Sequence, residues 1–180
     1  MNSFYTEDEL SDIGLKSYGN NVLISKKASI YSAHNILIGS NVRIDDFCIL
    51  SGNINLGSCI HISAYSAIYG SHGVIMEDYS GLSPNSLIFS AMDDFSGNYL
   101  INPMVDKKLT NVKGGLVILE RFVQIGAGSI VFPDLKIHIG SVIGALSLVN
   151  KSLDEWGIYA GIPVKRIKSR SKELIKLLNE

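Results

Sequence analysis

The 180-residue sequence predicts an all-β solenoid, in which the chain coils repeatedly around one continuous hydrophobic core. Three observations support this prediction: aliphatic residues recur every six positions, a second small or apolar residue precedes each of them by two, and one long segment interrupts the series. Neither a helix of period 3.6 nor a regularly alternating strand places two inward residues in every six. A short strand followed by a corner places two inward residues in every six.

The aliphatic series extends through most of the chain. Its members are Ile24, Ile30, Ile38, Ile44, Leu50, Leu56, Ile62, Ile68, Met76, Leu82, Ile88, Leu119, Ile125, Val131, Ile137, Ile143 and Val149. The positions two residues earlier include Ala28, Val42, Cys48, Ile54, Ile60, Ser66, Ser80, Ser86, Val123, Ser129, Ser141 and Ser147. Three hexapeptides would close one triangular coil, and stacked coils would bury the series. The seventeen repeats predict between five and six coils.

Three insertions break the register of the repeats. Two-residue insertions follow Ile30 and Ile68, and a long insertion occupies about 89–115. The long insertion contains turn-forming residues, beginning with Asp93 and Asp94, and it has no aliphatic series. Insertions of this length in a compact domain are often functional loops, although a tolerated excursion from a corner is the alternative. We therefore expect a loop that protrudes from the solenoid.

The two ends of the chain predict short helices. Thr6-Glu7-Asp8-Glu9 has the pattern of a capping box, which predicts a helix within an N-terminal lead-in, residues 1–21. Leucine and isoleucine recur at helical spacing after Ser171, which predicts a helix within the C-terminal segment 161–180. We expect that helix to pack on the solenoid, residues 22–160, or on a neighbouring subunit.

Composition excludes several classes of protein. The net charge of −1 gives no general footprint for nucleic acid. Without a signal sequence or an apolar run of about 18 residues, we expect a cytoplasmic protein with no membrane insertion. Two cysteines are too few for a disulfide framework. A basic cluster near the C-terminus could hold a phosphate-rich ligand or could be a solvated tail; it consists of Lys165, Arg166, Lys168, Arg170 and Lys172.

Two of the four histidines are well placed to act as a general base. His61 precedes the inward Ile62, so its side chain should point out of the solenoid. His72 lies in the second short insertion, one coil below the corner from which Asp93 and Asp94 depart. A histidine near a carboxylate has a fixed tautomer and a stabilised imidazolium. Either histidine could also be an ordinary surface residue.

The repeats resemble those of the hexapeptide-repeat acyltransferases, whose solenoid is left-handed. The resemblance is carried by Ile38-Gly-Ser-Asn-Val-Arg, by Ile125-Gly-Ala-Gly-Ser-Ile and by Tyr159-Ala-Gly-Ile-Pro-Val-Lys-Arg-Ile, which is similar to the segment that ends these solenoids. It implies that acetyl-CoA is a co-substrate bound along the late coils. The implied binding residues are Gly126, Ala127, Gly144, Ala145, Ser147, Pro163, Lys165 and Arg166. Small residues would let the pantetheine arm approach the backbone, and the basic pair would meet phosphate.

Two further stretches, Cys59-Ile-His-Ile-Ser-Ala-Tyr and Phe89-Ser-Ala-Met-Asp-Asp, resemble a branch found with surface-polysaccharide genes. Members of that branch acetylate sugars, often amino sugars carried on a nucleotide. Galactoside-type relatives have a histidine in the departing loop, where this chain has two aspartates. The resemblance therefore implies His61 as the base and Asp93 and Asp94 as acceptor-binding or base-orienting residues, with His72 as a second candidate base.

The resemblance also implies a homotrimer with the carrier groove and the acceptor pocket between adjacent subunits. An oligomer would cover apolar residues expected on the coil surfaces, namely Phe47, Tyr65, Tyr69, Phe122 and Phe132. The sequence thus predicts an acetyl-CoA-dependent acetyltransferase acting on a hydroxyl or amino group of a nucleotide-linked sugar, for surface polysaccharide, lipopolysaccharide or O-antigen synthesis.

Two alternatives remain for the same solenoid. A zinc hydratase would need three converging histidines, and only His61 and His72 fall near one another in the repeat register, so no metal is expected. A non-catalytic scaffold would have no use for the Ala160-Gly-Ile-Pro segment or for the loop that carries Asp93 and Asp94.

Overall fold

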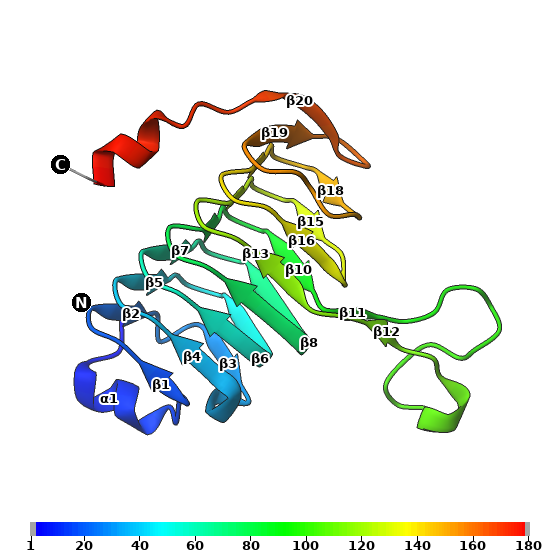
Figure 1. Ribbon diagram of the computed structural model, residues 1–180. Helices are drawn as coiled ribbons and strands as arrows, with labels where there is room; N and C mark the ends of the chain where they lie inside the picture. The colour runs from blue at the N-terminus through cyan, green and yellow to red at the C-terminus, as the bar shows by residue number, and fades with distance from the viewer. Residues whose placement is uncertain (1–2, 179–180) are drawn as a thin grey trace.

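The computed structural model describes residues 3–178 and shows a parallel β-helix with an arm projecting from its side (Figure 1). One sheet, which we call the first sheet, forms one side of the coils. It contains β2 (Val22–Ile24), β5 (Val42–Ile44), β7 (Ile60–Ile62), β9 (Gly81–Leu82), β14 (Gln124–Ile125), β17 (Val142–Ile143) and β19 (Gly157–Ala160), followed by the antiparallel β20 (Lys165–Ser169).

A second sheet wraps the other two sides of each coil. It contains β1 (Ser17–Tyr18), β3 (Ser29–Tyr31), β4 (Ile36–Ile38), β6 (Ile49–Leu56), β8 (Ala67–Met76), β10 (Leu87–Phe89), β13 (Val117–Leu119), β15 (Ile130–Val131), β16 (Leu135–Ile137) and β18 (Leu148–Val149). The strands β6 and β8 continue through a corner, where Gly52 and Gly73 have φ of +98° and +100°, a region that favours glycine. The short insertion after Ile68 therefore lengthens a strand.

The chain makes about seven turns, more than the five to six predicted. The aliphatic series undercounts them because it misses the start of the first turn and all of the last one. At the start, β1 carries the exposed Tyr18 at the place of an inward aliphatic residue. At the end, the inward place in β19 is taken by Tyr159, which is buried.

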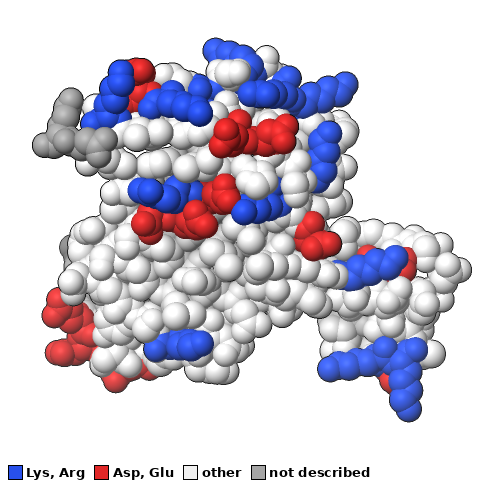
Figure 2. All heavy atoms as spheres, in the orientation of Figure 1, with Lys and Arg blue, Asp and Glu red and all other residues white. Residues whose placement is uncertain are grey.

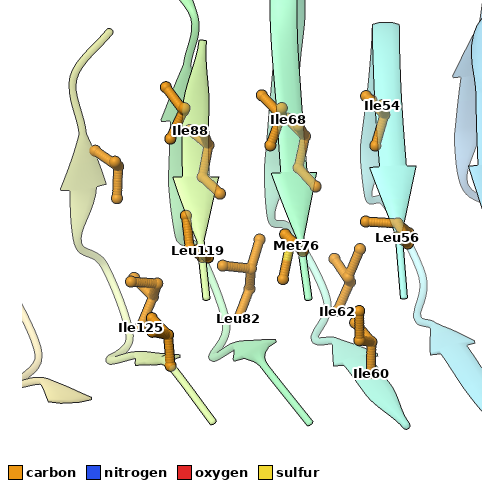
Figure 3. Close-up of a cluster of buried hydrophobic side chains, with 14 of the residues drawn as sticks. Ile54, Leu56, Ile60, Ile62, Ile68, Met76, Leu82, Ile88, Leu119 and Ile125 are labelled. Carbon is orange, nitrogen blue, oxygen red and sulfur yellow. The ribbon is translucent and has the colours of Figure 1, made fainter. Parts of the chain in front are cut away.

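The predicted inward residues form the core. Every member of the aliphatic series except Ile30 is at most 3% exposed. Figure 3 shows how Leu56, Met76 and Leu119 follow one another from coil to coil. Where the second inward position is a serine, its hydroxyl can donate to a backbone carbonyl of the next coil, as Ser129 does to Gly144 at 3.0 Å. The core is therefore continuous along the whole body.

Aromatic residues at the corners stack in ladders. Phe47 and Tyr65 lie with ring centroids 5.0 Å apart, and both are exposed as predicted. Phe122 was predicted to face outwards, and this prediction was wrong. Its side chain is buried because it lies between Tyr79 and Trp156 in a second ladder.

The N-terminal helix has the predicted cap. In α1 (Glu7–Asp12), the backbone N–H of Glu9 donates to Thr6 Oγ1, and the backbone N–H of Thr6 donates to Glu9 Oε2. The helix buries Leu10 against the first coil. The short 3₁₀ helix η1 (Ala33–Asn35) forms within the first two-residue insertion. Residues 1–2, part of the predicted lead-in, lie outside the described residues.

The C-terminal helix differs from the prediction. It is a 3₁₀ helix, η3 (Glu173–Leu178), and it buries none of its residues. The segment after β20 carries it away from the body (Figure 1), and its apolar side chains stay largely exposed. Residues 179–180 lie outside the described part. No helix of residues 3–178 is long and apolar enough to span a membrane.

The long insertion forms the arm. At its base, β11 (Ala91–Met92) pairs antiparallel with β12 (Lys113–Gly114), and a 3₁₀ helix, η2 (Lys107–Leu109), lies within it. The arm leaves the body after β10 and returns at β13, at the corner opposite the first sheet (Figure 1). Its apolar side chains are unusually exposed; Phe95 and Met104 are 70% and 90% exposed.

Candidate functional site

The residues that directly follow the strands of the first sheet line one corner of the solenoid, which we call the first corner. They include Asp45, Ser63, Ser83, Gly126 and Gly144. The backbone N–H of each of the first four donates to the carbonyl just before the next member, as Gly126 does to Ile143 at 2.8 Å. The five residues therefore stack coil on coil along one edge. This edge is polar in its N-terminal part and has only small residues in its C-terminal part.

The predicted carrier-binding glycines and alanines lie in the C-terminal part of the first corner. Gly126, Ala127 and Gly144 are half-buried, and Ala145 is exposed. A Cβ at position 126 would lie 2.6 Å from the backbone nitrogen of Ala145, so only glycine allows this close approach of two coils. Ser147 is buried, and its hydroxyl accepts a hydrogen bond from the N–H of Gly161 at 3.0 Å. Ser147 therefore supports the corner from inside.

The other predicted carrier residues lie at the C-terminal end of the solenoid. Pro163 follows a cis peptide bond in the turn before β20, and Lys165 and Arg166 begin that strand with exposed side chains. Figure 2 shows basic side chains gathered over this end of the molecule. These positions leave Lys165 and Arg166 accessible to a phosphate group.

Two members of the basic cluster hold the tail on the body. Arg170 Nη1 donates to the carbonyls of Phe122 and Gly140, at 2.8 and 3.0 Å. The ammonium group of Lys172 lies 5.3 Å from the centre of the Trp156 ring, within the range of a cation–π contact. The cluster is therefore neither a wholly solvated tail nor a wholly free anion site.

His61 points outwards from β7, as predicted, and its partner is Asp45. His61 Nε2 lies 2.7 Å from Asp45 Oδ2, and Arg43 Nε donates to Asp45 Oδ1 at 2.7 Å. Partial burial raises the pKa of Asp45, but the hydrogen bonds from Arg43 and His61 outweigh it and hold that pKa below its usual value. The sequence analysis missed Asp45. A comparison of polar residues one coil apart would have found it.

Ser83 was also missed by the sequence analysis. It lies between Ser63 and Gly126 on the first corner, and it is half-buried. Its hydroxyl has no hydrogen-bond partner among residues 3–178, whereas its carbonyl accepts from both Ser66 and Ser86. The backbone at Ser83 is thus fixed while its side chain stays available.

The paired aspartates of the arm have different surroundings. The Asp94 side chain is only 7% exposed, and it accepts hydrogen bonds from Ser96 N at 2.8 Å, Asn111 Nδ2 at 2.8 Å and Lys113 Nζ at 3.0 Å. The hydrogen bonds from Ser96, together with those from Lys113 and Asn111, hold the pKa of Asp94 far below its usual value. Asp94 is therefore ionised, and it fastens the arm to its base.

Asp93 has no hydrogen-bond or ion-pair partner in the part of the chain that the structure describes. It lies where two cavities meet on either side of β11. The larger, of about 610 Å³, lies within the arm, and its polar lining consists of Asn102, Lys107, Thr110 and Asn111. The smaller, of about 380 Å³, lies between the arm and the body, and its apolar lining includes Phe89, Phe95, Ile130, Phe132 and Pro133. One free carboxylate thus borders a cavity of mixed lining and an apolar one.

His72 packs at the base of the arm. Its backbone N–H donates to Ser90 Oγ at 2.8 Å, and its Nδ1 lies 3.2 Å from Ser71 Oγ. A Cβ on Gly114 of β12 would lie only 2.7 Å from His72 Nδ1. His61 belongs to the first sheet and His72 to the opposite corner, so the expectation that they fall near one another was wrong. The short insertion carries His72 past a second strand before the chain turns again.

Within one chain, the candidate residues thus form two groups. His61 and the carrier residues follow the first sheet and the first corner, whereas His72, Asp93 and Asp94 surround the base of the arm. Asp45, rather than Asp93 or Asp94, is the carboxylate that contacts His61. No three His, Cys, Asp or Glu side chains within residues 3–178 converge as a metal site.

Comparison with known proteins gives a consistent result. No protein-family model matches the chain. It is 45% identical over 178 residues to a dTDP-4-amino-4,6-dideoxy-D-glucose acyltransferase of Escherichia coli, covering 97% of this chain and 93% of that protein. It is 26% identical to a putative lipopolysaccharide biosynthesis O-acetyl transferase of Escherichia coli K12, covering 83% and 76%.

Solved structures of AntD, an N-acyltransferase from Bacillus cereus, are similar over the whole fold. A variant of AntD in which one serine is replaced by alanine, in complex with dTDP-4-amino-4,6-dideoxyglucose and coenzyme A, has a TM-score of 0.98 at 52% identity, covering 99% of this chain and 97% of that one. The complex with dTDP and 3-hydroxybutyryl-CoA has a TM-score of 0.97 at 52% identity, covering 99% and 96%. The predicted left-handed parallel β-helix is confirmed.

Proposed function

The chain belongs to the hexapeptide-repeat sugar acyltransferases, and we propose that it transfers an acyl group from a coenzyme A thioester to the amino group of a dTDP-linked 4-amino-4,6-dideoxyglucose. The acceptor is the one named for both the Escherichia coli relative and the AntD complex. The sequence prediction of a hydroxyl or an amino acceptor is thereby narrowed to the amine.

The choice of an amine comes from the amino sugar named for the two relatives, and the observation that carries the acceptor site in this chain is the unpartnered carboxylate of Asp93. A carboxylate can accept a hydrogen bond from an amino group and so hold it in place. Asp94 cannot serve in this way while Ser96, Asn111 and Lys113 occupy its oxygens. The adjoining cavity of about 610 Å³ is within the usual size of small-ligand sites, and its lining combines apolar residues with Asn102, Thr110 and Asn111, which could bond a sugar, and Lys107, which could meet a phosphate.

The first corner is the proposed place of the acyl donor. Gly126, Ala127, Gly144 and Ala145 leave a backbone edge on which a pantetheine arm could lie and bond its amides. Lys165 and Arg166, with Pro163 before them, would hold the phosphates at the far end of the same edge. Ser147 supports this edge from the core. The thioester would then end near Ser83 and Ser63.

The proposed site needs two copies of the chain. In one chain, Asp93 and the first corner lie on different edges of a three-sided body. A closed ring of three copies would bring the arm of one copy against the first corner of the next. It would also cover the exposed Phe95 and Met104 of the arm. We therefore propose a homotrimer with three sites, each built from two copies.

In the proposed reaction, the sugar nitrogen attacks the thioester carbonyl. The new C–N bond forms and the C–S bond breaks, and the proton lost by the amine ends on the thiolate sulfur of coenzyme A. Asp93 would orient the amine by accepting one of its hydrogens, which is a positional contribution to the rate. Of the predicted bases, His61 is the one that shares an edge with the donor, whereas His72 lies behind the arm.

The acyl group and the biological setting follow from the same site. We expect acetyl as the donor group, and the apolar cavity of about 380 Å³ beside Asp93 has room for a longer one, such as the 3-hydroxybutyryl group bound to AntD. The reaction would occur in the cytoplasm, where nucleotide sugars and coenzyme A thioesters are made. Its product would enter surface polysaccharide or lipopolysaccharide synthesis, as the name of the 26% identical relative suggests.

An acyl-transfer assay tests the proposal directly. The purified protein is incubated with acetyl-CoA or 3-hydroxybutyryl-CoA and dTDP-4-amino-4,6-dideoxyglucose, and both thiol release and product mass are followed. We expect one acyl group to be added to the amino sugar. The matched dTDP-linked sugar with a 4-hydroxyl group should not react. Absence of thiol release with either donor, with the protein folded and both ligands in excess, would reject the proposed function.

A further inference from the structure

We propose that the C-terminal end of the solenoid is a docking surface for a bilayer that contains anionic phospholipids. The surface consists of the turn at Ile162, the strand β20 and the helix η3. It combines exposed basic side chains with exposed aliphatic ones, which is typical of a segment that lies on a membrane without crossing it. The proposal concerns where the protein is held and not how it transfers an acyl group.

Positive charge is concentrated at this end of the chain. Residues 150–178 contain seven lysines and arginines against three carboxylates, those of Asp154, Glu155 and Glu173, which gives a net charge of +4. Residues 3–14, at the other end, contain four carboxylates and no lysine or arginine. Figure 2 shows acidic side chains over the end that carries α1 and basic ones over the end that carries β20. The molecule is therefore polarised along its length, although its net charge is only −1.

The free positive charge of this end lies mainly on β20. This strand is the last of the first sheet and pairs on one side only, with β19. The side chains of Lys165, Arg166 and Lys168 are all exposed on it. Arg170 and Lys172, by contrast, contact the body of the solenoid. The edge of the sheet thus presents a short basic strand to whatever lies beyond the last coil.

Aliphatic side chains lie among these charges. Ile162 in the turn before β20 is 74% exposed, Ile167 within β20 is 62% exposed, and Leu177 in η3 is 70% exposed. The helix η3 buries none of its residues, and Figure 1 shows it away from the body. At a bilayer, such side chains would leave water for the boundary between headgroups and acyl chains, while the lysines and arginines would stay at the level of the lipid phosphates.

Three copies would present this surface on one side of the oligomer. Ser83 lies just before the strand from which the arm departs, and Gly126 lies just after the strand at which the chain resumes the first sheet. An arm that meets this part of a neighbour's first corner stays at its own level, so the coils of all three copies stack along the threefold axis. Their C-terminal ends then lie at one height and could contact a bilayer together. This step rests on the homotrimer proposed above, whereas the surface itself is present in each chain.

The mixture of charge and apolar surface favours a bilayer over the other partners of a basic surface. The phosphates of a nucleic acid would contact the basic residues and leave Ile162, Ile167 and Leu177 in water. A second molecule docked end to end would bring like charges together. The phosphates of the acyl donor are a third possibility, but that proposed contact uses only Lys165 and Arg166.

The test is co-sedimentation of the full chain with lipid vesicles, with coenzyme A in excess so that the proposed donor site is occupied. One set of vesicles contains phosphatidylcholine alone. The other contains equal parts of phosphatidylcholine and the anionic phosphatidylglycerol. We expect binding to the anionic vesicles only, and we expect this binding to weaken as the salt concentration rises.

Variants separate the contributions of charge and of apolar surface. Lys168→Glu should lower the affinity for anionic vesicles at least about tenfold, because each basic residue near an anionic surface contributes about fivefold. Ile167→Asn and Leu177→Asn should each lower it about threefold or more, because less apolar area leaves water. The matched control is Lys16→Glu, which changes the charge of an exposed lysine at the opposite end and should bind as the wild type does. All four variants should keep wild-type acyl transfer in the absence of vesicles.

Four outcomes would overturn the inference, and none of them affects the acyl-transfer assay that tests the proposed function. The first is equal binding, or no binding, to the two kinds of vesicle. The second is an equal loss from Lys16→Glu and Lys168→Glu, which would show an effect of net charge alone. In the third, a short DNA duplex displaces the vesicles and both asparagine variants bind as the wild type does, which would assign the surface to nucleic acid. In the fourth, Leu177→Asn breaks the oligomer in light scattering, which would assign η3 to a contact between copies.

Discussion

The body and the arm of this molecule differ in how much apolar surface they bury and in how they are held in place. In the body, nearly every aliphatic residue of the repeat is buried and every coil is hydrogen-bonded to the next. In the arm, apolar residues are exposed, and a few polar contacts around Asp94 hold the segment in place. The comparison indicates that the body provides stability, whereas the arm buries little and presents the unpartnered carboxylate of Asp93, on which the proposed acceptor site depends. The same split explains why the arm has an unused carboxylate and the core has almost no unused polar group.

The strongest test of this division is removal of the arm. Residues 93–112 are replaced by Asn-Gly, which closes a two-residue hairpin between the adjacent ends of β11 and β12. We expect acyl transfer to fall by at least about 10³-fold, because the acceptor loses its positioning groups. Circular dichroism should still show a folded β-helix. Unfolding of the body on removal of the arm would contradict the division.

The converse change shortens one core residue of the body. Ile125→Ala leaves a void between coils, and we expect the free energy of unfolding to fall by about 2–5 kcal/mol in chemical denaturation. The matched change in the arm is Met104→Ala, at a side chain that is 90% exposed, with an expected effect under about 0.5 kcal/mol. Equal losses from the two variants would show that the arm shares the stability of the body.

Substitutions of the two aspartates of the arm should have different effects, one on the rate of acyl transfer and the other on the local structure of the arm. Asp93→Asn removes a charge-assisted hydrogen bond to the amine, worth about 1.5–3 kcal/mol, so we expect kcat/KM to fall about 10–100-fold with no change in melting temperature. Asp94→Asn should instead make the arm more susceptible to thermolysin at neutral pH. If thermolysin cleaved the arm of Asp93→Asn more readily than that of the wild type, Asp93 would have a structural role, and the division of roles between the two aspartates would be contradicted.

The smallest expected effect is a loss of local stability in the arm at low pH. Because the pKa of Asp94 in the folded chain lies below its ordinary value of 3.8, its stabilising contribution is present above about pH 4 and is lost as the pH falls below that value. Labelled methionine methyl groups can report this by NMR. We expect the Met92 signal in the arm to shift on acidification before the Met76 signal in the core does. Simultaneous shifts would contradict a separate titration of the arm.

The repeat made the body highly predictable from sequence. Burial follows a period of six, so the inward residues and the position of the arm could both be read from the aliphatic series and its break. The number of coils was less accessible, because Tyr18 and Tyr159 replace aliphatic residues in the terminal turns. Phe122 was assigned to the surface because the sequence does not reveal a ladder between residues more than thirty positions apart.

For the candidate site, the resemblance to the family proposed individual residues, but it did not predict which of them contact one another. The resemblance pointed to His61, which lies on the outward face of β7, to the paired aspartates at the base of the arm, and to the small residues near Gly126 at the first corner. It did not reveal that His61 pairs with Asp45, because that contact depends on the register between two coils. It also did not distinguish Asp93 from Asp94, because their difference arises from Asn111 and Lys113 at the far end of the insertion.

The central claim is that each site combines the arm of one copy with the first corner of another, and mixed oligomers test it most directly. One variant lacks the arm, as above, and the other carries Ala145→Trp, which fills the donor edge at an exposed position. Each should be inactive alone. After co-expression in equal amounts, about a quarter of the interfaces would pair an intact arm with an intact corner, so we expect about a quarter of wild-type activity. Activity no greater than the sum of the separate variants would contradict a shared site.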